Sequence, residues 1–136
     1  MSIITVNVLV NASLEKVWDS WTNPQHIVNW NFASDDWHAP AAKNDLTVGG
    51  TFVHTMAAKD GSFSFDFSGK FTEITPNKSI SYLLDDDRKV DVSFEPFEGQ
   101  VMLIESFEAE TQNSEDLQRM GWQAILNNFK KYTESL

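Results

Sequence analysis

The sequence predicts an α+β fold with an antiparallel sheet of about six to seven strands, a long C-terminal helix, and two short helices after the first strand. Two observations lead to this prediction. Residues 114–136 have the periodicity of one amphipathic helix, and residues 47–109 contain serial short segments of strand character separated by turn residues. With 136 residues, we expect a single domain covering 1–136.

The N-terminal part predicts one strand followed by two short helices. Residues 3–10 are apolar and rich in β-branched side chains, which favours a strand. Ser13 then suits the N-cap of a helix whose apolar residues include Val17 and Trp21. Asn23 and Pro24 suit the cap and first position of a second helix, which we expect to extend to about residue 30.

Residues 31–45 are the least regular part of the sequence. Phe32 and Trp37 are large apolar residues among polar ones, so this loop either folds back on the core or rims an opening. A short strand is expected over residues 37–41. Further strands are expected at 51–58, 62–74, 80–84, 90–94 and 101–109, and the turn at 59–61 predicts a hairpin.

The strand at 62–74 shows the clearest alternation in the chain. Its aromatic residues share one face with Gly69, and its polar residues share the other; the aromatic ones are Phe63, Phe65, Phe67 and Phe71. This pattern is typical of an antiparallel sheet with one covered side. Gly69 fits a bend in the sheet or the close approach of another group.

The C-terminal helix has an unusually wide apolar face. Residues such as Leu117, Met120 and Phe129 recur at three- and four-residue steps, and Trp122 widens the stripe to more than half of the circumference. We therefore expect this helix to be embraced by a curved sheet or shared with a second helix. Asn113 or Ser114 can cap its start.

Two polar residues, Gln118 and Asn128, lie inside this apolar face. The simpler interpretation is that they lie at its edge or bond to backbone. The alternative is that they face a cavity.

Composition narrows the possible partners. The chain carries 20 acidic and 10 basic residues, a net charge of −10, which disfavours nucleic acid and anionic membranes. It has no cysteine, which excludes disulfides and thiolate chemistry. Because residues 3–10 have no basic leader and are too short to span a bilayer, we expect a soluble cytoplasmic protein without membrane insertion.

Several short motifs occur together in a characteristic order. They are Val17-Trp18, Trp21-Thr22-Asn23-Pro24, Trp30, Val48-Gly49-Gly50-Thr51-Phe52, Asp60-Gly61, Gly69-Lys70-Phe71-Thr72-Glu73-Ile74 with Pro76, and Gly121-Trp122 with Leu126. In this arrangement the chain resembles the activator of heat-shock-protein-90 ATPase homologue-like family of the START-like (SRPBCC) superfamily. The resemblance covers nearly the whole chain.

The resemblance implies a helix-grip fold, in which a curved antiparallel sheet wraps around the C-terminal helix. It also implies a cavity between sheet and helix, often suited to apolar or amphipathic small molecules. The chain departs from the family at Val48, where a basic residue is common. We therefore do not expect this chain to make an anion contact at that position. We also expect no separate N-terminal co-chaperone domain, which weakens the case for ATPase activation.

His54 and Glu105 are the candidate catalytic residues. His54 alternates with Phe52 and Met56, and the simpler interpretation is a satisfied core or edge histidine. Residues 101–104 are apolar on both faces, so the simpler interpretation buries Met102 and Ile104 and exposes Glu105. If both candidates point inward, they could act as acid and base in the cavity.

The remaining polar residues give weaker signals. We expect His26 and His38 to be exposed, and the acidic run at 85–87 to be a solvated turn rather than a cation site. No spacing indicates a metal, and no cofactor is expected. A monomer and a homodimer both remain open.

Three functions are compatible with these observations. The first is a binding module for a hydrophobic or amphipathic small molecule, and the alternatives are a cyclase or dehydratase using His54 and Glu105, and a co-chaperone-like protein-binding module. The residues expected to contact a ligand are Trp30, Phe32, Phe52, His54, Phe65, Phe67, Tyr82, Phe94, Glu105, Gln118, Trp122, Ile125 and Phe129.

Overall fold

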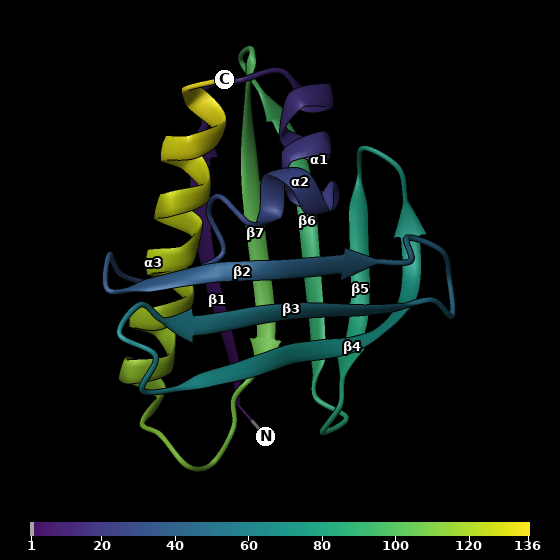
Figure 1. Ribbon diagram of the computed structural model, residues 1–136. Coiled ribbons are helices and arrows are strands. Elements are labelled where there is room, and N and C mark those ends of the chain that lie inside the picture. Colours follow the sequence, from purple (N-terminus) through teal and green to yellow (C-terminus); the bar gives the residue numbers. More distant parts are fainter. Residues whose placement is uncertain (1) are drawn as a thin grey trace.

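The computed structural model describes residues 2–136 and contains one seven-stranded antiparallel sheet with three helices (Figure 1). The strands are β1 (Ile3–Val10), β2 (Trp37–Asn44), β3 (Thr51–Ala58), β4 (Ser64–Thr75), β5 (Ser79–Leu84), β6 (Lys89–Phe97) and β7 (Gln100–Glu108). The helices are α1 (Leu14–Thr22), α2 (Pro24–Ile27) and α3 (Glu115–Glu134). This arrangement confirms the predicted fold class.

The strand order β1-β7-β6-β5-β4-β3-β2 brings the first and the last strand together. Successive strands from β2 to β7 are joined as neighbours, and β1 pairs with β7 over its whole length. The two edges of the sheet are therefore β1 and β2.

The sheet bends strongly along β4. In Figure 1, β1, β7, β6 and β5 run up and down the view, whereas β2 and β3 cross it. The long strand β4 belongs to both halves, and its pairing with β5 shifts register between Phe71 and Glu73. A bulge of this kind increases local bending, which gives the sheet a concave face.

Helix α3 lies against the concave side and packs along β1, while α1 and α2 cover one end (Figure 1). At that end Trp21 stacks on Trp30 with ring centroids 4.9 Å apart, and both rings meet Phe129 edge-on. Phe94 meets Trp18 at 5.1 Å. These contacts make a closed aromatic core under the short helices.

The predicted helix caps are confirmed. The Ser13 hydroxyl accepts a hydrogen bond from the Lys16 amide, and the Asn23 side chain accepts one from Gln25. Of the two alternatives for α3, Ser114 is the cap and accepts from Leu117. Each cap satisfies an amide that has no partner inside its helix. Strand β2 extends three residues further than expected, and α2 ends three residues earlier.

Part of the wide apolar face of α3 is not covered, contrary to the prediction. Leu117 is 56% exposed and Met120 is 68% exposed, whereas Leu126 and Phe129 are fully buried. Met120 lines a surface groove together with residues of β1, at the outer edge of the sheet. The sheet therefore embraces only the face of α3 that carries Leu126 and Phe129.

The expected buried face of β4 is also only partly buried. Phe71 is buried, but Phe63 and Phe65 are exposed. Both rings pack edge-on against Trp37 at 6.0 Å instead of against α3. Phe63 and Phe65 therefore form a partly exposed aromatic cluster with Trp37 rather than part of the core.

No helix in residues 2–136 combines the length and apolar character needed to cross a membrane.

Candidate functional site

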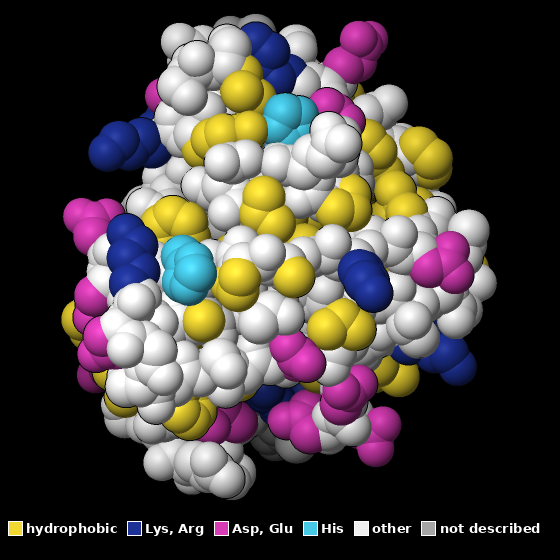
Figure 2. Space-filling model, viewed as in Figure 1, with side chains coloured by type: hydrophobic (Ala, Val, Ile, Leu, Met, Phe, Trp, Pro, Cys, Tyr) yellow, Lys and Arg dark blue, Asp and Glu magenta, His cyan; other side chains and the backbone are white. Residues whose placement is uncertain are grey.

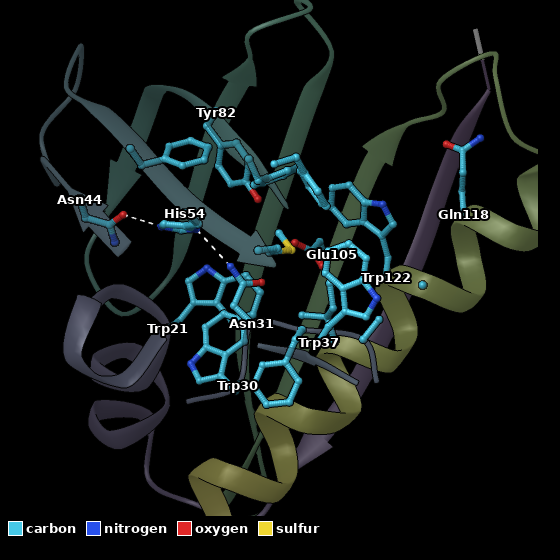
Figure 3. A pocket seen from close by; sticks show the side chains of 18 of the residues that line it. Trp21, Trp30, Asn31, Trp37, Asn44, His54, Tyr82, Glu105, Gln118 and Trp122 are labelled. Carbon is cyan, nitrogen blue, oxygen red and sulfur yellow. Dashed lines mark hydrogen bonds between the residues drawn. The ribbon is translucent and has the colours of Figure 1, made fainter. Parts of the chain in front are cut away.

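A cavity of about 430 Å³ lies between α3, the concave face of the sheet and the loop that precedes β2 (Figure 3). Strands β3, β4, β5 and β7 each contribute inward-facing residues, and α3 contributes Gly121, Trp122 and Ile125. The lining is mostly apolar and aromatic, with a few polar groups at defined positions. Small-molecule sites in proteins have this composition.

Most of the residues expected to contact a ligand do line this cavity. They are Trp30, Phe32, Phe52, His54, Phe65, Phe67, Tyr82, Glu105, Gln118, Trp122 and Ile125. The prediction was wrong for Phe94 and Phe129, because they lie in the closed aromatic core and do not line the cavity. Trp18 covers Phe94, and Trp21 and Trp30 cover Phe129, so neither ring reaches the cavity.

Several lining residues were not predicted from the sequence. Trp37 and Asn31 come from the irregular loop, and Asn44 comes from the end of β2. The isolated apolar residues of that loop were a signal, since an opening was one of the two expectations for it. The asparagines gave no periodic signal at all.

Glu105 is 4% exposed and points into the cavity, so the interpretation that it is exposed is wrong. Val101, Leu103 and Phe107 share its buried face, and Met102 and Ile104 lie on the partly exposed outer face. Strand β7 is central, and its inward side faces the space enclosed with α3. Glu105 pairs with Val6 on β1 and Val92 on β6, so apolar residues flank it on both sides.

Burial raises the pKa of Glu105 to about 8, because an ionised carboxylate loses its hydration there. A hydrogen bond from the Tyr82 hydroxyl acts in the opposite direction and lowers this pKa. Tyr82 is itself buried, and burial followed by the nearby charge of Glu105 raises its pKa well above the usual value. At neutral pH this pair is mainly uncharged and can both donate and accept hydrogen bonds.

His54 lines the cavity between two asparagines. Its Nε2 lies 2.8 Å from the Asn44 side-chain oxygen, and its Nδ1 lies 3.4 Å from the Asn31 amide nitrogen (Figure 3). The Asn44 amide in turn donates to the carbonyl of Thr22 at 2.7 Å. Burial lowers the pKa of His54 to about 4, so the ring is neutral with its proton on Nε2. The prediction of a satisfied histidine is confirmed, although the ring also borders the cavity.

Comparison with known proteins identifies the family. Residues 11–134 match the family model described as activator of Hsp90 ATPase homolog 1-like protein. The chain belongs to this family.

Solved structures agree with this assignment. The AHSA1-like protein from Aeromonas hydrophila is 44% identical, with a TM-score of 0.93 over 98% of this chain and 93% of that one. A protein from Cytophaga hutchinsonii is 52% identical, with a TM-score of 0.84 over 97% of this chain and 92% of that one. The Aha1 dimer from Colwellia psychrerythraea shares the fold at 17% identity, with a TM-score of 0.75 over 98% and 97%. A search of curated proteins found no match.

In this member of the family, the two polar residues of the α3 face have different surroundings. Gln118 is buried, borders the cavity, and bonds to the backbone of Glu110 and Asn113. Asn128 donates to the carbonyl of Phe32 and does not line the cavity. Gln118 therefore both bonds to backbone and faces the cavity, whereas Asn128 only bonds to backbone.

The other histidines lie outside the cavity. His38 is exposed as expected, whereas His26 is half-buried, which corrects the prediction. The His26 ring lies between Asp19, 3.1 Å away, and the Tyr132 hydroxyl, 2.6 Å away, and so ties α1, α2 and α3 together. Among residues 2–136, no group of three or more His, Asp or Glu side chains is arranged to hold a metal ion.

Proposed function

We propose that this protein binds a hydrophobic or amphipathic small molecule in the cavity between the sheet and α3. The observation that carries the proposal is the cavity itself, with its aromatic walls and the buried polar groups of Tyr82, Glu105 and His54. Its volume of about 430 Å³ falls within the range of roughly 300–1,000 Å³ common for small-molecule sites.

The walls of the cavity support binding because they are already ordered. Trp122 stacks on Phe107 with centroids 3.8 Å apart, and Phe52 meets Tyr82 edge-on at 4.9 Å. The hydrogen bond from Asn128 to Phe32 holds the loop at one side of the cavity. A preformed site requires little ordering when a ligand enters, which favours affinity.

Native mass spectrometry tests this proposal. The protein, purified without detergent, is compared under native and denaturing conditions for a co-purifying small molecule. Gly121→Leu would place a side chain in the cavity, because Gly121 lines it and has open space where a Cβ would stand. We expect this variant to lose the adduct, whereas Asn127→Leu, on the exposed side of α3, retains it. An adduct that survives Gly121→Leu unchanged would contradict the proposal.

A cyclase or dehydratase is the second candidate function. The observation in its favour is that His54 and Glu105 both line the same cavity. Neutral His54 would serve as base and protonated Glu105 as acid. Turnover of an identified ligand, lost in both His54→Gln and Glu105→Gln, would support it; a ligand released chemically unchanged would not.

The proposal also covers where the protein is located in the cell and whether it binds a protein partner. The absence of cysteine agrees with a reducing compartment, so we place the protein in the cytoplasm. A co-chaperone-like role stays a prediction from the family resemblance, and a pull-down for chaperone association tests it.

A further inference from the structure

Glu105 is a buried carboxyl without a cationic partner. The ion pairs among residues 2–136 join His26 to Asp19, Arg88 to Asp86, Lys89 to Asp91 and Lys130 to Glu134, and none involves Glu105. A buried carboxyl is costly to ionise unless a cation pairs with it. The residues of the cavity therefore supply no cation for this carboxyl, so a cationic partner would have to be brought by a ligand.

Arg88 borders the cavity but is not available as that complement. Its Nε donates to the Asp86 carboxylate at 2.7 Å, and its Nη1 donates to the carbonyl of Glu108 at 3.2 Å. Within the described residues 2–136, no lysine lines the cavity. A ligand cation would therefore meet little repulsion beside Glu105.

Aromatic rings surround the same space. Phe67 meets Trp122 edge-on at 5.8 Å, and Phe52 packs against both Phe67 and Tyr82. Ring faces attract organic cations through their quadrupole, most strongly where water is excluded. An acidic group among aromatic rings is the combination that recognises an ammonium carried by an apolar body.

The surface charge acts in the same direction. The chain has a net charge of −10, and the face drawn in Figure 2 carries acidic side chains over much of its area, several of them near the lower edge. Such a field draws cations toward the protein and repels anionic ligands such as fatty acids.

We propose that the ligand is an amphipathic amine whose ammonium group pairs with Glu105 and whose apolar body fills the aromatic cavity. This inference rests on the proposed binding function and specifies its ligand class. A primary, secondary or tertiary amine would serve, because each retains an N–H that can donate to the carboxylate.

Pairing with an ammonium requires Glu105 to give up its proton. The other titratable groups that line the cavity are His54 from β3, Tyr82 from β5, Arg88 before β6 and Glu110 after β7. With a pKa of about 8 for Glu105, ionisation at pH 7 costs about tenfold in affinity. Binding of the amine should therefore release close to one proton, and should strengthen as pH rises toward 8.

Isothermal titration calorimetry with three isosteric probes tests the inference. The probes are 4-phenylbutylamine, 4-phenylbutanol and 4-phenylbutyrate, titrated at pH 7 in two buffers of different ionisation enthalpy. We expect the amine to bind at least about tenfold more tightly than the alcohol, with proton release, and the acid to bind most weakly. Glu105→Gln should abolish the proton release and bring the affinity for the amine down to that for the alcohol.

Glu110→Gln is the matched control, since it removes the other carboxylate of the lining and should leave the amine preference intact. A cooperative urea-unfolding transition shows that the Glu105→Gln variant is folded. Equal affinities of amine and alcohol for the unaltered protein would overturn the amine inference and leave the proposed function standing. No binding of any probe would count against both.

Discussion

Tyr82 on β5 and Glu105 on β7 face each other across β6, inside a mostly apolar cavity. Their positions follow from the register, because Tyr82 pairs with Val90 and Glu105 pairs with Val92 on the strand between them. The two polar groups are therefore held by paired strands rather than by a loop. A site built in this way fixes both the position and the protonation of its carboxyl.

Glu105 should make the protein less stable as pH rises. Its pKa is about 8 in the folded protein and 4.5 ordinarily, so between these values the folded state holds a proton that the unfolded chain has lost. The free energy of unfolding should fall across that window, by at most about 1.4 kcal/mol per pH unit, and level off above pH 8. Urea unfolding at intervals between pH 5 and 8 measures this slope.

Glu105→Gln is the comparison, because it keeps a hydrogen-bonding group of the same size beside Tyr82. The difference in unfolding free energy between the two proteins should change by a few kcal/mol between pH 5 and 8. Because the pKa of His54 is lowered, this residue makes the free energy of unfolding rise with pH between about pH 4 and 6.5. The rise is the same in both proteins, so it cancels in the difference between them. A difference that stays constant with pH would contradict a buried, protonated Glu105.

Asn44→Ala should destabilise the protein although it removes only a small polar side chain. Asn44 accepts from His54 and donates to the carbonyl of buried Thr22, so its loss leaves two part-buried groups without partners. We expect a loss of about 1–3 kcal/mol in the free energy of unfolding, measured in urea at pH 7. Lys43→Ala, exposed on the same strand, should change stability by less than about 0.5 kcal/mol. Equal effects of the two substitutions would show that the asparagine bridge contributes nothing.

The parts of the fold that periodicity encodes were predictable. The alternation in residues 62–74 and the helical pattern in 114–136 predicted a strand and a helix, although not the burial of every side chain, and the caps at Ser13 and Asn23 mark helix starts. The cavity was expected from the family resemblance together with the surplus apolar surface of α3.

The placement of Glu105 was not predictable, because residues 101–104 are apolar on both faces and the pattern is symmetric there. The same limit applies to Asn31 and Asn44, which meet His54 only through tertiary folding. Exposure of Leu117 and Met120 depends on how far the sheet curls, which no local pattern records.

Two glycine-to-alanine substitutions should act in opposite directions. A Cβ on Gly69 would lie 2.3 Å from the Leu83 carbonyl oxygen, so Gly69→Ala must distort the β4–β5 pairing at the bend and should cost about 1–3 kcal/mol. A Cβ on Gly121 meets open space within α3, where alanine is favoured over glycine by about 0.5–1 kcal/mol. Thermal unfolding of both variants checks the signs, and a shift in the same direction for both would refute the argument.

Side chains of α3 form hydrogen bonds with the edge strand β1, and so prevent this strand from pairing with another molecule. Arg119, Gln123 and Lys130 donate to the carbonyls of Thr5, Asn7 and Leu9, at 2.9, 3.0 and 2.6 Å. These outward carbonyls of β1 would otherwise be available to pair with a strand of another molecule. At the opposite edge, β2 contains Pro40, which has no N–H, within an irregular register between His38 and Ala41.

Removing the polar cover of β1 should therefore promote association. We expect Arg119→Ala combined with Gln123→Ala to form concentration-dependent dimers or larger species, measured by sedimentation velocity from about 10 to 500 μM. Met120→Ala is the control. Met120 is exposed and lies between Arg119 and Gln123 in the sequence, so this substitution removes apolar surface without freeing a carbonyl of β1. A double variant that stays monomeric up to about 500 μM would contradict the prediction and exclude the β1 edge as a route to self-association.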